Sequence, residues 1–219
     1  MSIDAAGVPE RVRTQLEAMI LSGELQPGDR LNELSLSTRF GISRAHLREV
    51  VRALEEARLV QVVPNRGAHV RTLDLSEALE LFDVRAGLAR SAGRLAVLRG
   101  ARAQIKDIEE AHHGMAAAAS NADPDTFHTL NLRFHAGLMA AAANARLSEI
   151  DLAVRNEMQL YLRRNVSSEA QLRLSCEEHG AIVAALLAGD AEACGAAFER
   201  HILNGKRRLM DSGPLARRD

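Results

Sequence analysis

Aromatic side chains are scarce in this sequence: Phe, Tyr and Trp make up 3% of its 219 residues, and Trp is absent. Proteins that read RNA or single-stranded DNA commonly stack bases on aromatic side chains, so the composition disfavours that class. Only two cysteines are present. We expect both to be thiols rather than partners in a disulfide.

The sequence also lacks a long apolar run, a signal peptide and a targeting tail, so we expect a cytoplasmic protein. Its length suits one or two domains. Hydrophobic residues make up 47% of it, and the many alanines of the second half favour helices over sheet. Because the net charge is only −1, binding to nucleic acid would have to depend on a local basic patch.

Two short helices are predicted at residues 32–40 and 44–57. Gly41 between them allows a tight turn, and Ser43 is a suitable N-cap for the second helix. Apolar residues recur at helical spacing in both segments: Leu31, Leu34, Leu36 and Phe40, then Leu47, Val50, Val51 and Leu54. Arg44 and Arg48 are four residues apart on the opposite face, as in the recognition helix of a helix-turn-helix.

A β-hairpin is predicted next, with strands at 59–63 and 68–71 and a turn at Pro64-Asn65-Arg66-Gly67. Its turn places Arg66 where it can enter a minor groove or contact phosphates, as the wing of a winged helix does. The alternative is a solvated helix with incidental arginines followed by an ordinary hairpin. The order of all these elements favours a DNA-binding head.

Residues 12–70 resemble the N-terminal domain of the GntR family of bacterial transcription regulators. The resemblance is carried, in the family's order, by Pro27-Gly28, Leu31-Asn32-Glu33, Gly41-Ile42-Ser43-Arg44, Leu47-Arg48-Glu49 and Pro64-Asn65-Arg66-Gly67. His46 departs from it, since the family usually has Pro there. The predicted DNA-contacting residues are Arg30, Ser43, Arg44, His46, Arg48, Asn65, Arg66 and Gly67.

The rest of the chain is predicted to be an all-α antiparallel bundle, so the fold class is mainly α, with domains at residues 1–72 and 73–219. The breaks between helices fall at Gly, Asn, Pro and Ser positions. Helices are expected at 75–98, 102–119, 124–143, 145–166, 168–188 and 190–210. Bundles of this kind commonly place ligand or metal sites between facing helices.

Three histidines and an asparagine are candidate metal ligands in this bundle. Asn131 and His135 are four residues apart and share a helical face, whereas His179 and His201 lie on two later helices. Three imidazoles and an amide oxygen suit a borderline divalent metal, with zinc expected first and nickel or manganese as alternatives. Each histidine taken alone is more commonly structural.

The same residues resemble the ligand domain of the FadR-like, or FCD, branch of the GntR family. There an Asp or Asn is followed after three residues by His, then by a His in a Glu-His context and a His in the last helix. The resemblance implies that Arg85 grips an effector carboxylate. A surface Arg paired with Glu80 or Asp83 is the alternative. Ala89 stands where the family tends to have Glu.

Other candidates rank lower in the bundle. His128 is expected at the mouth of the site or outside it, and Cys176 and Cys194 are expected to be buried apolar groups rather than ligands. A zinc hydrolase is the main rival, but no general base stands beside the ligands. Glu178 adjoins His179 but points roughly 100° around the helix from it. A second rival is a structural metal in a DNA-binding protein without an effector.

The sequence therefore predicts a transcription regulator rather than an enzyme. It would bind double-stranded operator DNA as a homodimer and respond to a small organic acid at the metal and Arg85. Repression relieved by the ligand is the commoner sign in the family that the chain resembles.

Overall fold

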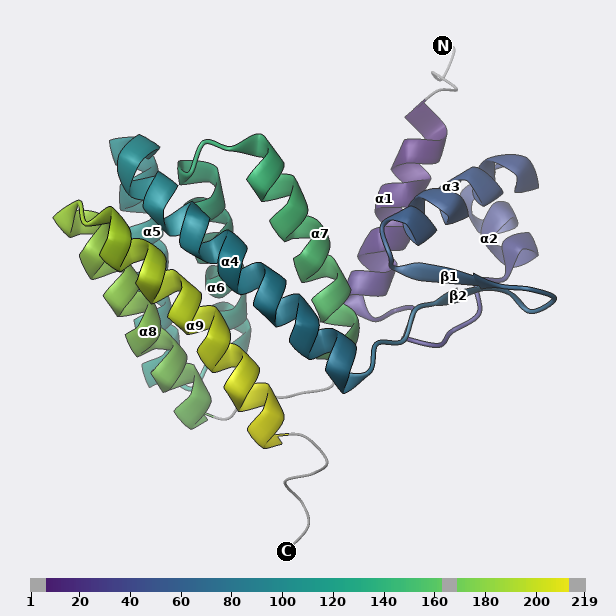
Figure 1. The fold of residues 1–219 in the computed structure, drawn as a ribbon. Coiled ribbons are helices and arrows are strands. Elements are labelled where there is room, and N and C mark those ends of the chain that lie inside the picture. The colour runs from purple at the N-terminus through teal and green to yellow at the C-terminus, as the bar shows by residue number, and fades with distance from the viewer. Residues whose placement is uncertain (1–6, 163–168, 213–219) are drawn as a thin grey trace, which may run out of the picture. The chain divides into compact units, whose positions relative to one another are not determined.

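The computed structural model describes residues 7–162 and 169–212, which form two compact units. Of these residues, 7–78 and 155–162 form one unit, and 79–154 and 169–212 form the other. The elements of the described residues are, in order, α1 (Gly7–Ser22), α2 (Glu33–Phe40), α3 (Arg44–Glu56), β1 (Val60–Val63), β2 (Gly67–Val70), α4 (Leu75–Arg99), α5 (Arg102–Ser120), α6 (Pro124–Ala141), α7 (Ala145–Leu162), α8 (Glu169–Ala188) and α9 (Ala191–Ser212) (Figure 1). The mainly α fold predicted from the sequence is confirmed.

The first unit is a winged helix-turn-helix. Asn32 caps α2, its Oδ1 accepting hydrogen bonds from the backbone of Leu34 and Ser35, each at 3.1 Å. Gly41 ends α2 at φ 65°, a left-handed conformation that glycine adopts without a steric penalty. α1 was not among the helices predicted from the sequence. It supplies Val12, Leu16, Met19 and Ile20 to the core of this unit, which also holds Leu160 of α7.

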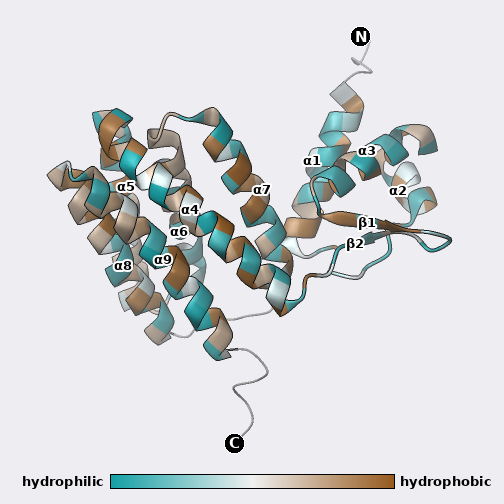
Figure 2. Cartoon of the chain, in the orientation of Figure 1, coloured by the Kyte–Doolittle hydropathy of each residue, from teal (hydrophilic) through white to brown (hydrophobic). Residues whose placement is uncertain are grey.

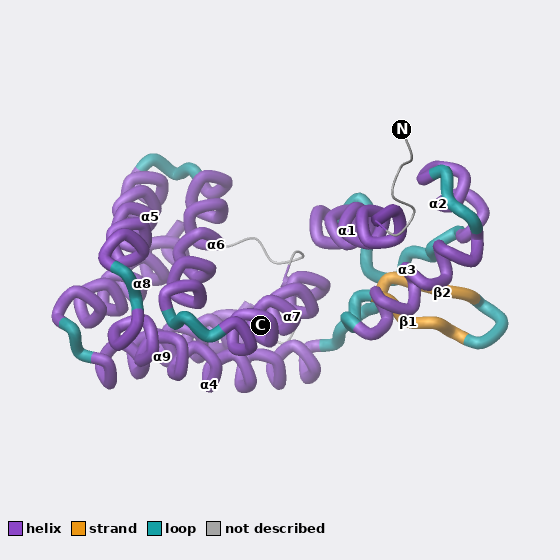
Figure 3. Tube along the Cα trace, turned by 90° about the horizontal axis from the view of Figure 1, so that it is seen from above, coloured by secondary structure: helices purple, strands orange, loops and turns teal. Residues whose placement is uncertain are grey.

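The wing is an antiparallel pair in which Val60 lies opposite Val70 and Val63 opposite Gly67. Figure 3 shows the two strands and the loop that joins them. Asn65 (φ 61°) and Gly67 (φ 86°) both take left-handed backbone conformations. These two conformations turn the chain and leave the Arg66 side chain between them exposed. The inner edge of the hairpin contributes buried Val60, Ala68 and Val70.

The second unit is a helical bundle built from α4 to α9, apart from the first four residues of α4 and the C-terminal part of α7. α5 packs on both α6 and α8, and α8 packs on α9. Hydrophilic and hydrophobic residues are interspersed along the helices of this unit (Figure 2), and small residues fill much of the interior: Ala89, Ala92, Ala96, Ala111, Ala141 and Ala142 are almost fully buried. The predicted helix at 145–166 ends at Leu162 in the described residues, and residues 163–166 lie outside them.

None of the described helices is both long and apolar enough to cross a membrane.

Candidate metal centre and DNA-binding surface

The recognition helix α3 presents its arginines to solvent. Ser43 caps this helix, its Oγ accepting a hydrogen bond from the His46 backbone N–H at 3.2 Å. Arg44, Arg48 and Arg52 recur every fourth residue and are all exposed, whereas the opposite face is buried in the core. Arg52 was not among the predicted DNA contacts. Its spacing of four residues from Arg48 shows that both lie on the same exposed face of the helix. Arg44 and His46 are exposed at the first turn, as base reading requires.

Arg48 has a partner within the unit. Its Nε lies 3.0 Å from Oε2 of Glu33 on α2, and 64% of the Arg48 side chain remains exposed. An exposed pair of this kind is worth about 0.2–1 kcal/mol. The pair is therefore weak, and it leaves most of the Arg48 side chain exposed to solvent.

Arg30 lies beside the wing. A Cβ placed on Gly67 would come within 3.7 Å of Arg30 Nε, and Arg30 forms a β-bridge with His69. Arg30, Asn65 and Arg66 are exposed. The predicted DNA contacts thus lie at two places, the first turns of α3 and the hairpin with Arg30.

Three histidines from three helices meet inside the second unit. His135 of α6, His179 of α8 and His201 of α9 are all buried. His201 Nε2 lies 3.2 Å from His179 Nε2 and 3.3 Å from His135 Nε2. A tetrahedral zinc ion with bonds of about 2.0–2.1 Å holds neighbouring ligand atoms about 3.3 Å apart. The two separations from His201 Nε2 therefore match edges of such a coordination shell, and the candidate ligand atoms of the three histidines all lie within 4.8 Å of one another.

Asn131 is the remaining predicted ligand. It lies one turn before His135 on α6, and its Oδ1 is buried with no hydrogen-bond partner among the described residues. A buried acceptor left without a partner costs about 1–3 kcal/mol. A cation that accepts this lone pair would remove the cost, and the three clustered imidazoles suit a divalent metal.

Two of the three histidines are held in the form that binds metals. Burial lowers the pKa of His179 well below its usual value, and nearby His201 and His112 lower it further. Burial also lowers the pKa of His201, although Glu178 opposes the shift. Both rings are therefore neutral near neutral pH, and a neutral imidazole offers one nitrogen lone pair to a metal.

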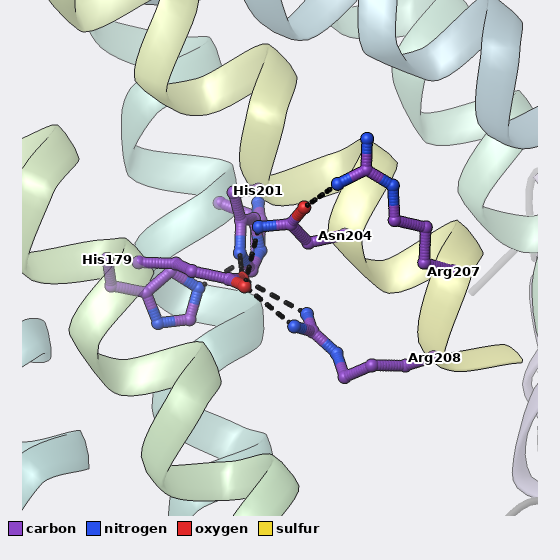
Figure 4. A network of polar contacts seen from close by, with 7 residues as sticks. His179, His201, Asn204, Arg207 and Arg208 are labelled. Atoms are coloured by element: carbon purple, nitrogen blue, oxygen red, sulfur yellow. Dashed lines mark hydrogen bonds and ion pairs between the residues drawn. The ribbon is translucent and has the colours of Figure 1, made fainter. Parts of the chain in front are cut away.

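Glu178 has a partner that the sequence analysis did not predict. It was considered only with respect to His179, but its Oε2 accepts a hydrogen bond from His201 Nδ1 at 2.7 Å. Arg208 donates to both of its oxygens, at 2.7 and 3.1 Å, and Asn204 donates to Oε1 at 2.9 Å (Figure 4). Burial raises the pKa of Glu178, but these hydrogen bonds outweigh that effect and lower it to about 2.

Arg85 is directed into the bundle rather than along its own helix. Its Nε lies 3.3 Å from Oδ1 of Asp151 on α7, a residue with no exposed surface. The predicted surface partner Asp83 instead binds Lys206. The charge of Arg85 lies close enough to His201 to lower its pKa. Arg85 is thus a cationic group near the histidine cluster, and its partner Asp151 was not predicted.

The lower-ranked candidates do not join the cluster. His128 is exposed on α6. Cys194 and Cys176 are buried free thiols, and burial raises the pKa of both, to about 11 for Cys194. Among the described residues, the His, Cys, Asp and Glu side chains that can share one metal ion are His135, His179 and His201.

Comparison with known proteins matches two regions of the chain to known families. Residues 9–70 match the family described as "Bacterial regulatory proteins, gntR family", and residues 80–204 match the FCD domain. The "HTH-type transcriptional repressor GlaR" of Escherichia coli is 29% identical over 84% of this chain and 87% of its own. The "Galactonate operon transcriptional repressor" of the same organism is 27% identical over 92% and 96%.

Solved structures show the same fold. The crystal structure of "a putative transcriptional regulator GntR from Rhodococcus sp. RHA1" has a TM-score of 0.76 and 25% identity, and the alignment covers 94% of this chain and 98% of that one. These families and relatives are transcription regulators and not enzymes. The chain belongs to the GntR family of bacterial transcription regulators, in the branch that carries an FCD domain.

Proposed function

We propose that this regulator binds operator DNA as a homodimer and senses a small carboxylate at a divalent metal in its bundle. The metal would be held by Asn131, His135, His179 and His201, with zinc as the first candidate. The proposal rests on the buried histidine cluster, in which His201 Nε2 lies 3.2 Å from His179 Nε2 and 3.3 Å from His135 Nε2. No side chain of this ligand set is anionic, so the metal keeps its full charge and favours an anionic effector.

Arg85 is proposed as the second contact of the effector. Its planar guanidinium can bind a carboxylate through two parallel hydrogen bonds. Asp151 occupies part of this hydrogen-bonding capacity and neutralises the charge of Arg85. An effector carboxylate would exchange with Asp151 or share Arg85 with it. A relative named for galactonate, itself a carboxylate, supports this chemical class.

A second copy of the chain is the proposed partner of α4. Val84 and Leu98 are 52% and 68% exposed, and Leu88, Leu95 and Ser91 lie between them at helical spacing. An apolar stripe on a regular helix can pair with its own copy about a two-fold axis. Such a dimer would supply two heads for an operator with approximate two-fold symmetry. The relatives named as repressors support repression as the output.

Fluorescence anisotropy tests the proposal with an operator selected from genomic fragments. Metal-loaded protein should lose or gain operator affinity on addition of one class of carboxylate, because the effector must favour one arrangement of the heads. Arg85→Gln should lose the response and keep DNA binding. Arg90→Gln, on the same helix and exposed, is the matched control. A response that survives chelation of the metal and Arg85→Gln would contradict the proposal.

A further inference from the structure

The Glu178 carboxylate is surrounded by three side chains of α9. His201, Asn204 and Arg208 reach it from successive turns, and together they make four hydrogen bonds of 2.7–3.1 Å. Figure 4 shows Asn204 and Arg208 directed to the same place as His201. Arg207, the neighbour of Arg208, contacts only the Oδ1 atom of Asn204 in this network. The two oxygens of Glu178 are thereby held in one orientation.

This arrangement has a consequence for His201. A carboxylate only accepts hydrogen bonds, so the proton of a neutral His201 must lie on Nδ1, which is 2.7 Å from Glu178. The lone pair of His201 then lies on Nε2, the atom that faces His135 and His179. Without the carboxylate, the proton can move to Nε2 and be donated to a neighbouring imidazole. Such a bond would block the lone pair that a metal needs.

We propose that Glu178, oriented by Arg208 and Asn204, is a positioning residue that fixes His201 as the Nδ1-protonated tautomer and thereby sets the metal affinity of the centre. The proposal rests on the metal centre described above. Carboxylates that accept from a ligating histidine commonly change metal affinity about 10–100-fold when they are replaced. Arg208 acts one step further out, because its two hydrogen bonds set the direction of the carboxylate.

The test compares Glu178→Gln with Glu177→Gln, an adjacent and exposed carboxylate as the matched control. Metal-free protein labelled with ¹⁵N is examined by long-range ¹H–¹⁵N NMR, with the His201 ring assigned from a His201→Gln variant. The wild type and the control should show Nδ1–H. Glu178→Gln should show a mixture, because an amide both accepts and donates.

Zinc affinity is measured on the same proteins by competition with a chelating indicator. Glu178→Gln should bind about 10–100-fold more weakly, Arg208→Gln should lose less, and Glu177→Gln should match the wild type. If Glu178→Gln does not fold, Arg208→Gln carries the test through the same two measurements. Unchanged tautomer and affinity in the variants would overturn the proposal.

The two proposals fail in distinguishable ways. If the wild type takes up no zinc, nickel or manganese, the metal centre is wrong, and the affinity part of this inference falls with it. The tautomer of His201 in metal-free protein still tests the action of Glu178. A wild-type ring protonated on Nε2 would overturn that action even if metal binds.

Discussion

Metal binding should stabilise the folded protein, and the His135→Ala variant should lose that stabilisation. Zinc at 100 times its dissociation constant adds about 2.7 kcal/mol if it binds only the folded state. For a chain of 219 residues each kcal/mol corresponds to about 2–4 °C in Tm. The expected rise is therefore about 5–11 °C, measured by circular dichroism or calorimetry with and without zinc.

The magnitude for the variant follows from the ligand set. His135 supplies one of the three imidazoles of the cluster. In the described part of the chain, His135, His179 and His201 are the one group of His, Cys, Asp or Glu side chains that could hold a metal ion. If its loss weakens binding about 100-fold, the same zinc concentration equals the new dissociation constant and adds only about 0.4 kcal/mol. The rise in Tm should then be about 1–2 °C.

The comparison is made within each protein, because removing a buried side chain lowers Tm by itself. His128→Ala is the matched control, since His128 lies two turns earlier on the same helix and is exposed. A chelator should reverse the zinc effect. An equal zinc-dependent rise in His135→Ala and the wild type would refute the three-histidine centre.

Three further predictions concern DNA binding and assembly. Arg44→Ala should cost about 1–3 kcal/mol on the selected operator by anisotropy, and an equal loss on random duplex would exclude base reading. Arg66→Ala should reduce the slope of log affinity against log salt concentration by about 0.9, so an unchanged slope would argue against a phosphate contact. Leu98→Glu should shift sedimentation from dimer to monomer by placing charge on the α4 stripe, and a retained dimer would locate the interface elsewhere.

Local signals in the sequence were sufficient for the recognition head and for the helix boundaries of the bundle. Asn32, Gly41 and Ser43 act through atoms within a few residues of themselves, so their capping and turning roles can be read from order alone. The helices α4 to α6 begin and end within two residues of their predicted limits. The sequence analysis did not predict α1, although its buried residues recur at helical spacing.

The partners across helices depended on tertiary structure. Helical periodicity shows which face of α4 or α8 is buried, but not which residue of another helix lies opposite. Arg85 was expected to pair with Glu80 or Asp83 if it lay on the surface, and it pairs instead with Asp151, 66 residues away. The sequence analysis considered Glu178 only as a general base beside His179, whereas in the structure its Oε2 accepts a hydrogen bond from His201 Nδ1.

The sequence by itself determined the winged head, the bundle and the order of the candidate ligands, because spacing along a helix and capping chemistry are local properties. Only the tertiary structure decided that the Nε2 atom of His201 lies 3.2 Å from that of His179 and 3.3 Å from that of His135, and that a carboxylate contacts the His201 ring. Those distances depend on the rotation and approach of α6, α8 and α9. That packing is set by the contacts of the whole bundle at once and not by any one helix.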